Sequence, residues 1–217
     1  MFFKVLGDIA IYLAVAVSLL YVLCYFKHRA AYKYLTIYLL VVGIVQLWAY
    51  YIGRGGAHQN NLFLSHYYFG LQFICLSMFY KHLLKYRWIV WIIVIILAVY
   101  LYQFYASPDL YYRYNPWGIV MTTLPIVVYS SLYLLKGINQ KTEFNIVSAG
   151  LLLYLLSTLL IFASGNVVID LDISKETKQI IIHVNRVLYL IFLAMVVFEW
   201  FKNYNCFKRK LKPNESR

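Results

Sequence analysis

The chain has 217 residues, of which 63% are hydrophobic and only 13% are charged, and its mean hydropathy is +0.68. This amount of apolar surface excludes a water-soluble domain of ordinary composition. The formal net charge of +12 is typical of loop residues beside anionic lipid headgroups. We therefore expect membrane lipids as partners and no nucleic acid.

Apolar runs long enough to cross the ~30 Å hydrocarbon layer as helices recur along the whole chain. A β-barrel would show alternating segments of ~10 residues instead. We predict an all-α polytopic membrane protein, a bundle of seven transmembrane helices at about residues 5–26, 34–53, 61–80, 88–105, 117–135, 145–165 and 179–201. The bundle forms a single domain, residues 1–201, and a basic tail follows at 202–217.

The positive charges predict the orientation of the bundle, because cytoplasmic loops carry an excess of Lys and Arg. Most Lys and Arg residues fall on one side of the predicted membrane, including Lys27, Arg29, Lys33, Lys81, Lys85, Arg87, Lys136, Lys141 and those of the tail. We expect the N-terminus outside, the C-terminus in the cytoplasm, and a location in the plasma membrane, the inner membrane of a bacterium.

Polar residues inside the first three spans are the first candidate ligand-binding residues, because each costs free energy in lipid unless it faces protein or water. Asp8 lies in the first span. The second span carries residues four apart on one helical face, Gln46, Tyr50 and Arg54. The third carries Ser65, Tyr68 and Gln72 on one face, with His66 beside them. All lie in the outer half of the predicted membrane.

The seventh span completes this set with His183, Asn185 and Arg186. A buried guanidinium requires a partner or a wet cavity, and Asp8 is the candidate counter-ion if the first and last helices are neighbours. Because these polar residues lie at a similar depth on several helices, they predict an outward-facing polar cavity that binds a small ligand or a lipid headgroup. The alternative is that the same groups only form hydrogen bonds between helices.

The cytoplasmic end carries weaker signals. Glu199 and Lys202 are three residues apart and predict an ion pair at the end of the seventh helix. The five histidines never occur three or four residues apart, so we expect no metal and no cofactor. Residues 179–201 contain no lysine, which excludes a retinal Schiff base in that helix.

The chain resembles a known family in three stretches. These are "NNLFLSHYYFGLQFICLSMFY" (60–80), "SAGLLLYLLSTLLIFASGN" (148–166) and "YLIFLAMVVFEWFK". It resembles an uncharacterised family of small seven-span bacterial integral membrane proteins over essentially its whole length. The matching polar positions are Asn60, Asn61, His66, Tyr67 and Gln72, although relatives tend to carry an acidic residue in place of Gln72. The resemblance implies a loose association with sensor-kinase systems and supplies no mechanism.

Two classes of function follow from these features. The first is a receptor-like protein, or an accessory to a membrane signalling system, that binds its ligand in the outer cavity and acts on a membrane or cytoplasmic signalling partner. The second is a metal-free intramembrane lipid-modifying enzyme, or a small transporter, that uses the same cavity. Transporters usually show repeated halves with broken helices, and no internal repeat is visible. We therefore favour the first class, a protein that is not an enzyme, and keep the second class as the alternative.

Overall fold

Long apolar runs fold as helices because a backbone surrounded by apolar groups must satisfy its hydrogen bonds within its own segment. The computed structural model describes residues 2–54, 62–112, 115–140, 142–163 and 175–205, and these contain no strand. Their seven long helices are α1 (Phe2–Val22), α2 (Ala30–Arg54), α3 (Leu62–Leu84), α4 (Ile89–Ala106), α5 (Pro116–Asn139), α6 (Asn145–Ala163) and α8 (Lys175–Glu199). Each predicted span falls on one of these helices, so the all-α prediction is confirmed for the described part of the chain.

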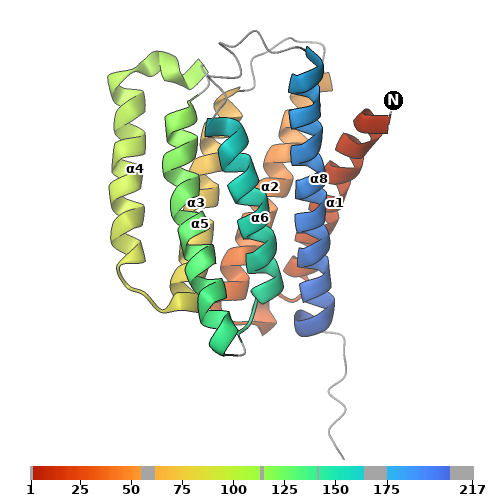
Figure 1. Ribbon diagram of the computed structural model, residues 1–217, viewed down its shortest axis with the longest axis vertical. Helices are drawn as coiled ribbons and strands as arrows, with labels where there is room; N and C mark the ends of the chain where they lie inside the picture. The colour runs from red at the N-terminus through yellow and green to blue at the C-terminus, as the bar shows by residue number, and fades with distance from the viewer. Residues whose placement is uncertain (1, 55–61, 113–114, 141, 164–174, 206–217) are drawn as a thin grey trace, which may run out of the picture.

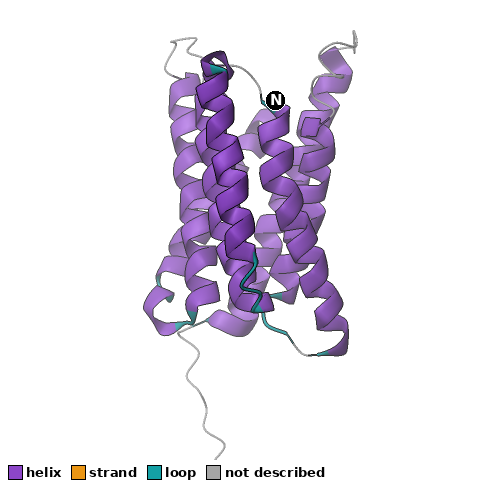
Figure 2. Ribbon diagram, turned by 90° about the vertical axis from the view of Figure 1, so that its left-hand side faces the viewer, coloured by secondary structure: helices purple, strands orange, loops and turns teal. Residues whose placement is uncertain are grey.

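Short helical turns connect or extend the long helices. They are two 3₁₀ turns, η1 (Tyr25–Lys27) and η2 (Pro108–Tyr112), and a π-helical turn, η3 (Trp200–Tyr204), that continues α8. The long helices run roughly along a common direction (Figure 2), and the turns η1 and η2 lie at opposite ends of the molecule. Successive helices therefore alternate in direction.

Four of the described helices are long and apolar enough to cross a membrane: Ala30–Ile52, Ile89–Ala106, Pro116–Ile138 and His183–Tyr204. Two more contain shorter apolar stretches, Leu6–Val22 and Asn145–Ile161. The remaining helix, α3, buries Gln72 and Ser77 among its apolar residues. These polar residues lower its average hydropathy.

Six of the seven long helices close into a ring in the order α1, α2, α3, α5, α6, α8 and back to α1. The first and last helices are thus neighbours, which is the arrangement that a pairing of Asp8 with Arg186 would require. Helix α4 stands outside the ring against α3, at the margin of the bundle (Figure 1). It buries only Ile89, Ile93 and Tyr100, because a helix that is apolar all round can leave most of its surface in contact with lipid.

Aromatic side chains tie α1, α2 and α8 together at one end of the ring. The Tyr21 hydroxyl donates a hydrogen bond to the Val196 carbonyl oxygen at 3.0 Å, and the Tyr32 hydroxyl donates to the Tyr21 carbonyl oxygen at 2.9 Å. The Trp200 indole N–H donates to the Tyr32 hydroxyl at 3.2 Å. These bonds satisfy buried polar groups and fix the relative positions of the three helices.

Glu199 does not form the predicted ion pair with Lys202. Its side chain is buried, with 1% of its surface exposed. One carboxylate oxygen accepts from the backbone N–H of Ile146 at 3.3 Å, and the other accepts from Asn203 Nδ2 at 2.6 Å. Ile146 lies in the first turn of α6, where unpaired N–H groups and the helix dipole favour a negative charge. The carboxylate therefore joins α8 to the start of α6, a contact that the spacing within one helix could not predict.

Candidate functional site

A cavity of about 310 Å³, lined by both apolar and polar residues, lies between α2, α3, α6 and α8. Its lining residues are Val45, Gln46, Ala49, Leu64, Ser65, Tyr68, Phe69, Gln72, Tyr154, Leu155, Thr158 and Asn185. The lining extends from the middle of the bundle toward the end where α2 and α6 finish and α3 and α8 begin. Five of the predicted ligand-binding residues, Gln46, Ser65, Tyr68, Gln72 and Asn185, thus come together in one cavity.

The third helix contributes a single face to the cavity. Ser65, Tyr68, Phe69 and Gln72 follow the three- and four-residue spacing that places side chains one above another on a helix. At a rise of ~1.5 Å per residue, Gln72 lies roughly 15 Å from the start of α3. It is therefore the deepest cavity residue of this helix.

Gln72 has an unusual environment for an amide. Its side chain is 1% exposed, and neither its Oε1 nor its Nε2 atom has a hydrogen-bond partner among the described residues. Burying an unpaired amide costs about 1–3 kcal/mol in proteins, so such groups are normally satisfied by protein, water or ligand. The cavity has room for several molecules the size of water. Gln72 is thus a buried, unsatisfied donor and acceptor in the wall of the cavity.

Helix α6 supplies two polar cavity residues that are not among the predicted ligand-binding residues, Tyr154 and Thr158. The Thr158 hydroxyl donates to Asn185 Oδ1 at 3.1 Å, which orients the Asn185 amide. The ring of Tyr154 stacks on Phe192, with centroids 5.7 Å apart and an interplanar angle of 10°. Tyr154 and Thr158 are four apart in the apolar run of the sixth span, and this spacing is the only signal in the sequence that could have paired them.

Arg186 points away from the cavity. Its guanidinium Cζ and Nη1 atoms lie 3.5 Å from the position that a Cβ atom at residue 7 would occupy, so the group packs against Gly7 of α1. Asn185 and Arg186 are adjacent, and adjacent helical residues face about 100° apart. Helix α8 thus presents Asn185 to the cavity and Arg186 to α1. Asp8 follows Gly7 in α1 and is half-buried, and its pairing with Arg186 stays a prediction.

His66 lies in a different pocket, of about 350 Å³, between α3, α4 and η2. The imidazole is buried, with its centroid 5.0 Å from the ring of Phe104 and 6.3 Å from that of Tyr111. At the mouth, the hydroxyls of Tyr67 and Tyr111 are 3.1 Å apart, and this hydrogen bond raises the pKa of Tyr111. The pocket is mostly apolar. It lies on the opposite face of α3 from the cavity, so His66 is separated from the other predicted ligand-binding residues by the width of this helix.

The three remaining candidates also lie outside the cavity lining. His183 is half-buried, one helical turn before Arg186 on α8. The ring of Tyr50 meets that of Tyr12 in α1 edge to face, with centroids 6.5 Å apart. Arg54 is the last residue of α2, and its side chain lies outside the described part of the structure.

The fold and the cavity define a helical protein with several helices capable of crossing a membrane. Comparison with protein-family models, with curated proteins and with solved structures finds no match to this chain. The geometry of its own residues is therefore the basis for a proposal about its function.

Proposed function

We propose that the protein is a multi-pass plasma-membrane protein, in the inner membrane of a bacterium, whose cavity binds a small uncharged ligand or the uncharged part of a lipid headgroup. We infer a receptor-like role, or one accessory to a membrane signalling system. The observation that carries this proposal is Gln72, a buried amide without a described protein partner beside a cavity large enough for a small molecule.

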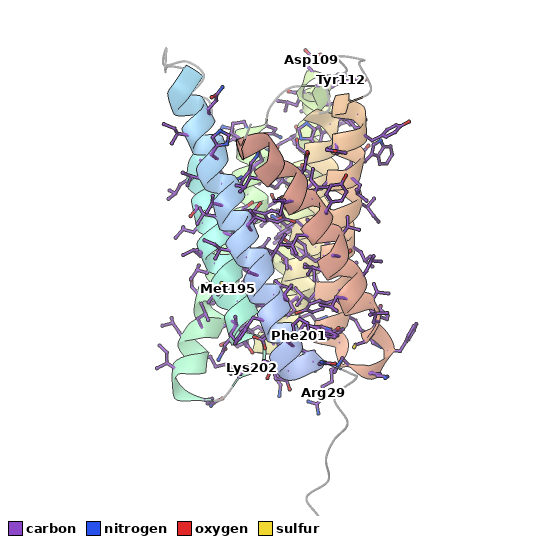
Figure 3. The ribbon with its side chains drawn as sticks, turned by 90° about the vertical axis from the view of Figure 1, so that its right-hand side faces the viewer. Arg29, Asp109, Tyr112, Met195, Phe201 and Lys202 are labelled. Carbon is purple, nitrogen blue, oxygen red and sulfur yellow. The ribbon has the colours of Figure 1, made fainter. Side chains whose placement is uncertain are left out.

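The proposed topology has seven spans, with the N-terminus outside and the C-terminus in the cytoplasm. It is supported by the separation of charge between the two ends of the bundle, since Arg29 and Lys202 lie at one end and Asp109 at the other (Figure 3). The end with more Lys and Arg is expected to face the cytoplasm. The cavity then lies in the outer half of the membrane.

The lining of the cavity indicates the chemistry of the ligand. Its polar groups are amides and hydroxyls, and none of the described lining residues is charged. An ion would lose its hydration shell without gaining a counter-charge, which is unfavourable in an apolar surrounding. Amides and hydroxyls instead pair with an uncharged molecule that both donates and accepts hydrogen bonds. Val45, Leu64 and Leu155 provide apolar contacts for the rest of such a molecule.

Helix α8 is the proposed route from the cavity to a signalling partner. Asn185 contacts Thr158 of α6 at the cavity, and further along the two helices pack closely at Gly150. A Cβ atom there would lie 3.1 Å from Met195 Sδ and 3.2 Å from Phe192 Cδ2. A ligand that moves Asn185 would therefore move α6 and α8 together. The π-helical turn η3 continues α8 at the far end, and such turns are frequent at functional sites.

Binding is better supported than catalysis by the positions of the candidate residues. A metal-free enzyme would need acid and base groups at one site. His66 lies across α3 from the cavity, and neither His183 nor Asp8 lines it. The cavity itself offers amides and hydroxyls, which bind and orient molecules.

Ligand binding is tested with a panel of small uncharged amides, alcohols, esters and sugars and the purified protein in detergent. We expect a subset to raise the melting temperature, because a ligand at 100 times its Kd stabilises the folded state by about 2.7 kcal/mol. Asn185→Leu should abolish this response. Arg186→Gln, which changes the neighbouring residue on the α1 side, should preserve it. The proposal fails if Arg186→Gln abolishes the response while Asn185→Leu keeps it.

The outward opening is tested by labelling intact cells with a cationic, membrane-impermeant thiosulfonate. Ser65→Cys places a thiol in the cavity lining, where water allows thiolate to form, so we expect labelling from outside. Ser157→Cys is the matched control, because Ser157 lies on the exposed side of α6, where its hydroxyl bonds to the Leu153 carbonyl oxygen. A thiol facing lipid stays protonated and unreactive. Equal labelling of both variants, or labelling only from the cytoplasmic side, would contradict the topology.

A further inference from the structure

A third pocket lies at the opposite end of the bundle from the cavity. It has a volume of about 460 Å³ and is formed by the connection from α1 to α2, the residues before α6 and the turn η3. We call it the basic pocket, and its lining includes Lys27, His28, Arg29, Tyr32, Glu143 and Tyr204. Arg29 projects from this end of the bundle (Figure 3).

The charge of the basic pocket is predominantly positive. Lys27 and Arg29 are basic residues with exposed side chains, and Glu143 is the single carboxylate among the described lining residues. Helix α2 begins at Ala30, directly after these cations, so its unpaired N–H groups add to the positive potential. Cationic side chains together with helical N–H groups are the combination that binds oxyanions.

Buried aromatic residues hold the floor of the basic pocket in place. His28 Nε2 donates to the Tyr204 carbonyl oxygen at 3.1 Å, and the imidazole lies 4.5 Å from the ring of Tyr32. Tyr204 in turn stacks on Phe144, with centroids 4.5 Å apart and an angle of 14°. Tyr32, Phe144 and Tyr204 are all buried. The imidazole is therefore fixed, and its Nδ1 atom is the ring's remaining polar group.

We propose that the basic pocket binds a phosphate group, carried either by an anionic phospholipid headgroup or by a soluble phosphate. Arg29 offers a planar set of donors that matches phosphate oxygens, and Lys27 adds a second cation. The pocket lies at the end of helices that are apolar enough to span a membrane, which is the depth of lipid headgroups. This site is separate from the cavity near Gln72, and the proposal does not depend on ligand binding there.

The proposal is tested by titrating the purified protein in detergent with two probes and following thermal unfolding. One probe is short-chain phosphatidylglycerol, compared with a phosphate-free galactosyl diacylglycerol. The other is inorganic phosphate, compared with chloride at equal ionic strength. Lys27→Gln with Arg29→Gln should weaken binding about thirtyfold, because each cation near an anionic headgroup contributes on the order of a fivefold gain in affinity. Both side chains are exposed, so the double variant should fold.

The matched control removes the same charge at the same end of the bundle, with Arg87→Gln and Lys136→Gln. These residues do not line the basic pocket, and we expect their loss to weaken binding by less than about threefold. Loss of phosphatidylglycerol binding alone in the pocket variant identifies a lipid headgroup as the ligand, and loss of inorganic phosphate binding as well identifies phosphate itself. Equal weakening in both double variants, or no binding of either probe to the wild-type protein, would overturn the proposal.

Discussion

Gln72→Leu is expected to stabilise the unliganded protein while abolishing its response to uncharged ligands. The amide is buried without a described protein partner, and removing it relieves a desolvation cost of about 1–3 kcal/mol. Leucine has a similar size and a similar helix propensity, so α3 should be unaffected. For a domain of this size each 1 kcal/mol raises the melting temperature by about 2–4 °C. Thermal unfolding with and without the ligand panel measures both effects.

Gln103→Leu is the matched control, because the same substitution removes an amide that has partners. Gln103 Oε1 accepts from Asn115 Nδ2 at 3.1 Å, and Asn115 is itself 4% exposed. Leucine at position 103 leaves the Asn115 amide without its acceptor. We therefore expect the free energy of unfolding to fall by about 1–3 kcal/mol. The two Gln→Leu variants should therefore differ in the sign of their effect on stability. A loss of stability in both would make Gln72 a structural residue and would remove the basis of the proposed ligand site.

Gly118→Ala is expected to destabilise the contact between α4 and α5 by about 2 kcal/mol, measured by thermal unfolding. A Cβ atom at residue 118 would lie 2.7 Å from Tyr100 Cε2 and 2.8 Å from Asn115 Nδ2. Neither neighbour is free to move. The Tyr100 hydroxyl donates to the His66 carbonyl oxygen at 3.0 Å, and Asn115 accepts from the Gly118 N–H at 3.0 Å to cap α5.

Gly70→Ala tests whether this effect comes from the close approach and not from the loss of a glycine. A Cβ atom at residue 70 would lie 3.7 Å from Cε1 of the same Tyr100 ring, which is an ordinary contact. Alanine is favoured over glycine within a helix by roughly 1 kcal/mol, so Gly70→Ala should be neutral or slightly stabilising. Equal effects at the two positions would show that the Tyr100 ring does not restrict residue 118.

The cavity shows how far helical spacing can predict a site. Ser65, Tyr68 and Gln72 were predicted to share a face of one helix, and they do, because positions three and four apart in a helix point the same way. Spacing could not show that His66 faces α4, since that depends on which helix lies on the other side of α3. Spacing also could not show that Asn185 faces the cavity while Arg186 faces α1. Both orientations depend on the packing of α8 between α1 and α6.

The roles of polar residues that follow no helical pattern could not be predicted from the sequence. Thr158 orients Asn185, yet it lies in an apolar run where a single hydroxyl is usually a packing residue. Glu199 and Lys202 are close in sequence, and this spacing predicts an ion pair between them. In the structure the Glu199 carboxylate instead accepts a hydrogen bond from the first turn of α6. Both contacts join helices that are distant along the chain, so only the closed ring reveals them.

The sequence by itself determined that the chain is helical and where its helices lie, because apolar runs of this length leave the backbone no other way to satisfy its hydrogen bonds. The order of the ring, the place of α4 outside it and the residues that meet at the cavity were decided by tertiary packing alone. The physical reason is that many apolar helical faces are equivalent in composition, and only their shapes determine which of them pack together.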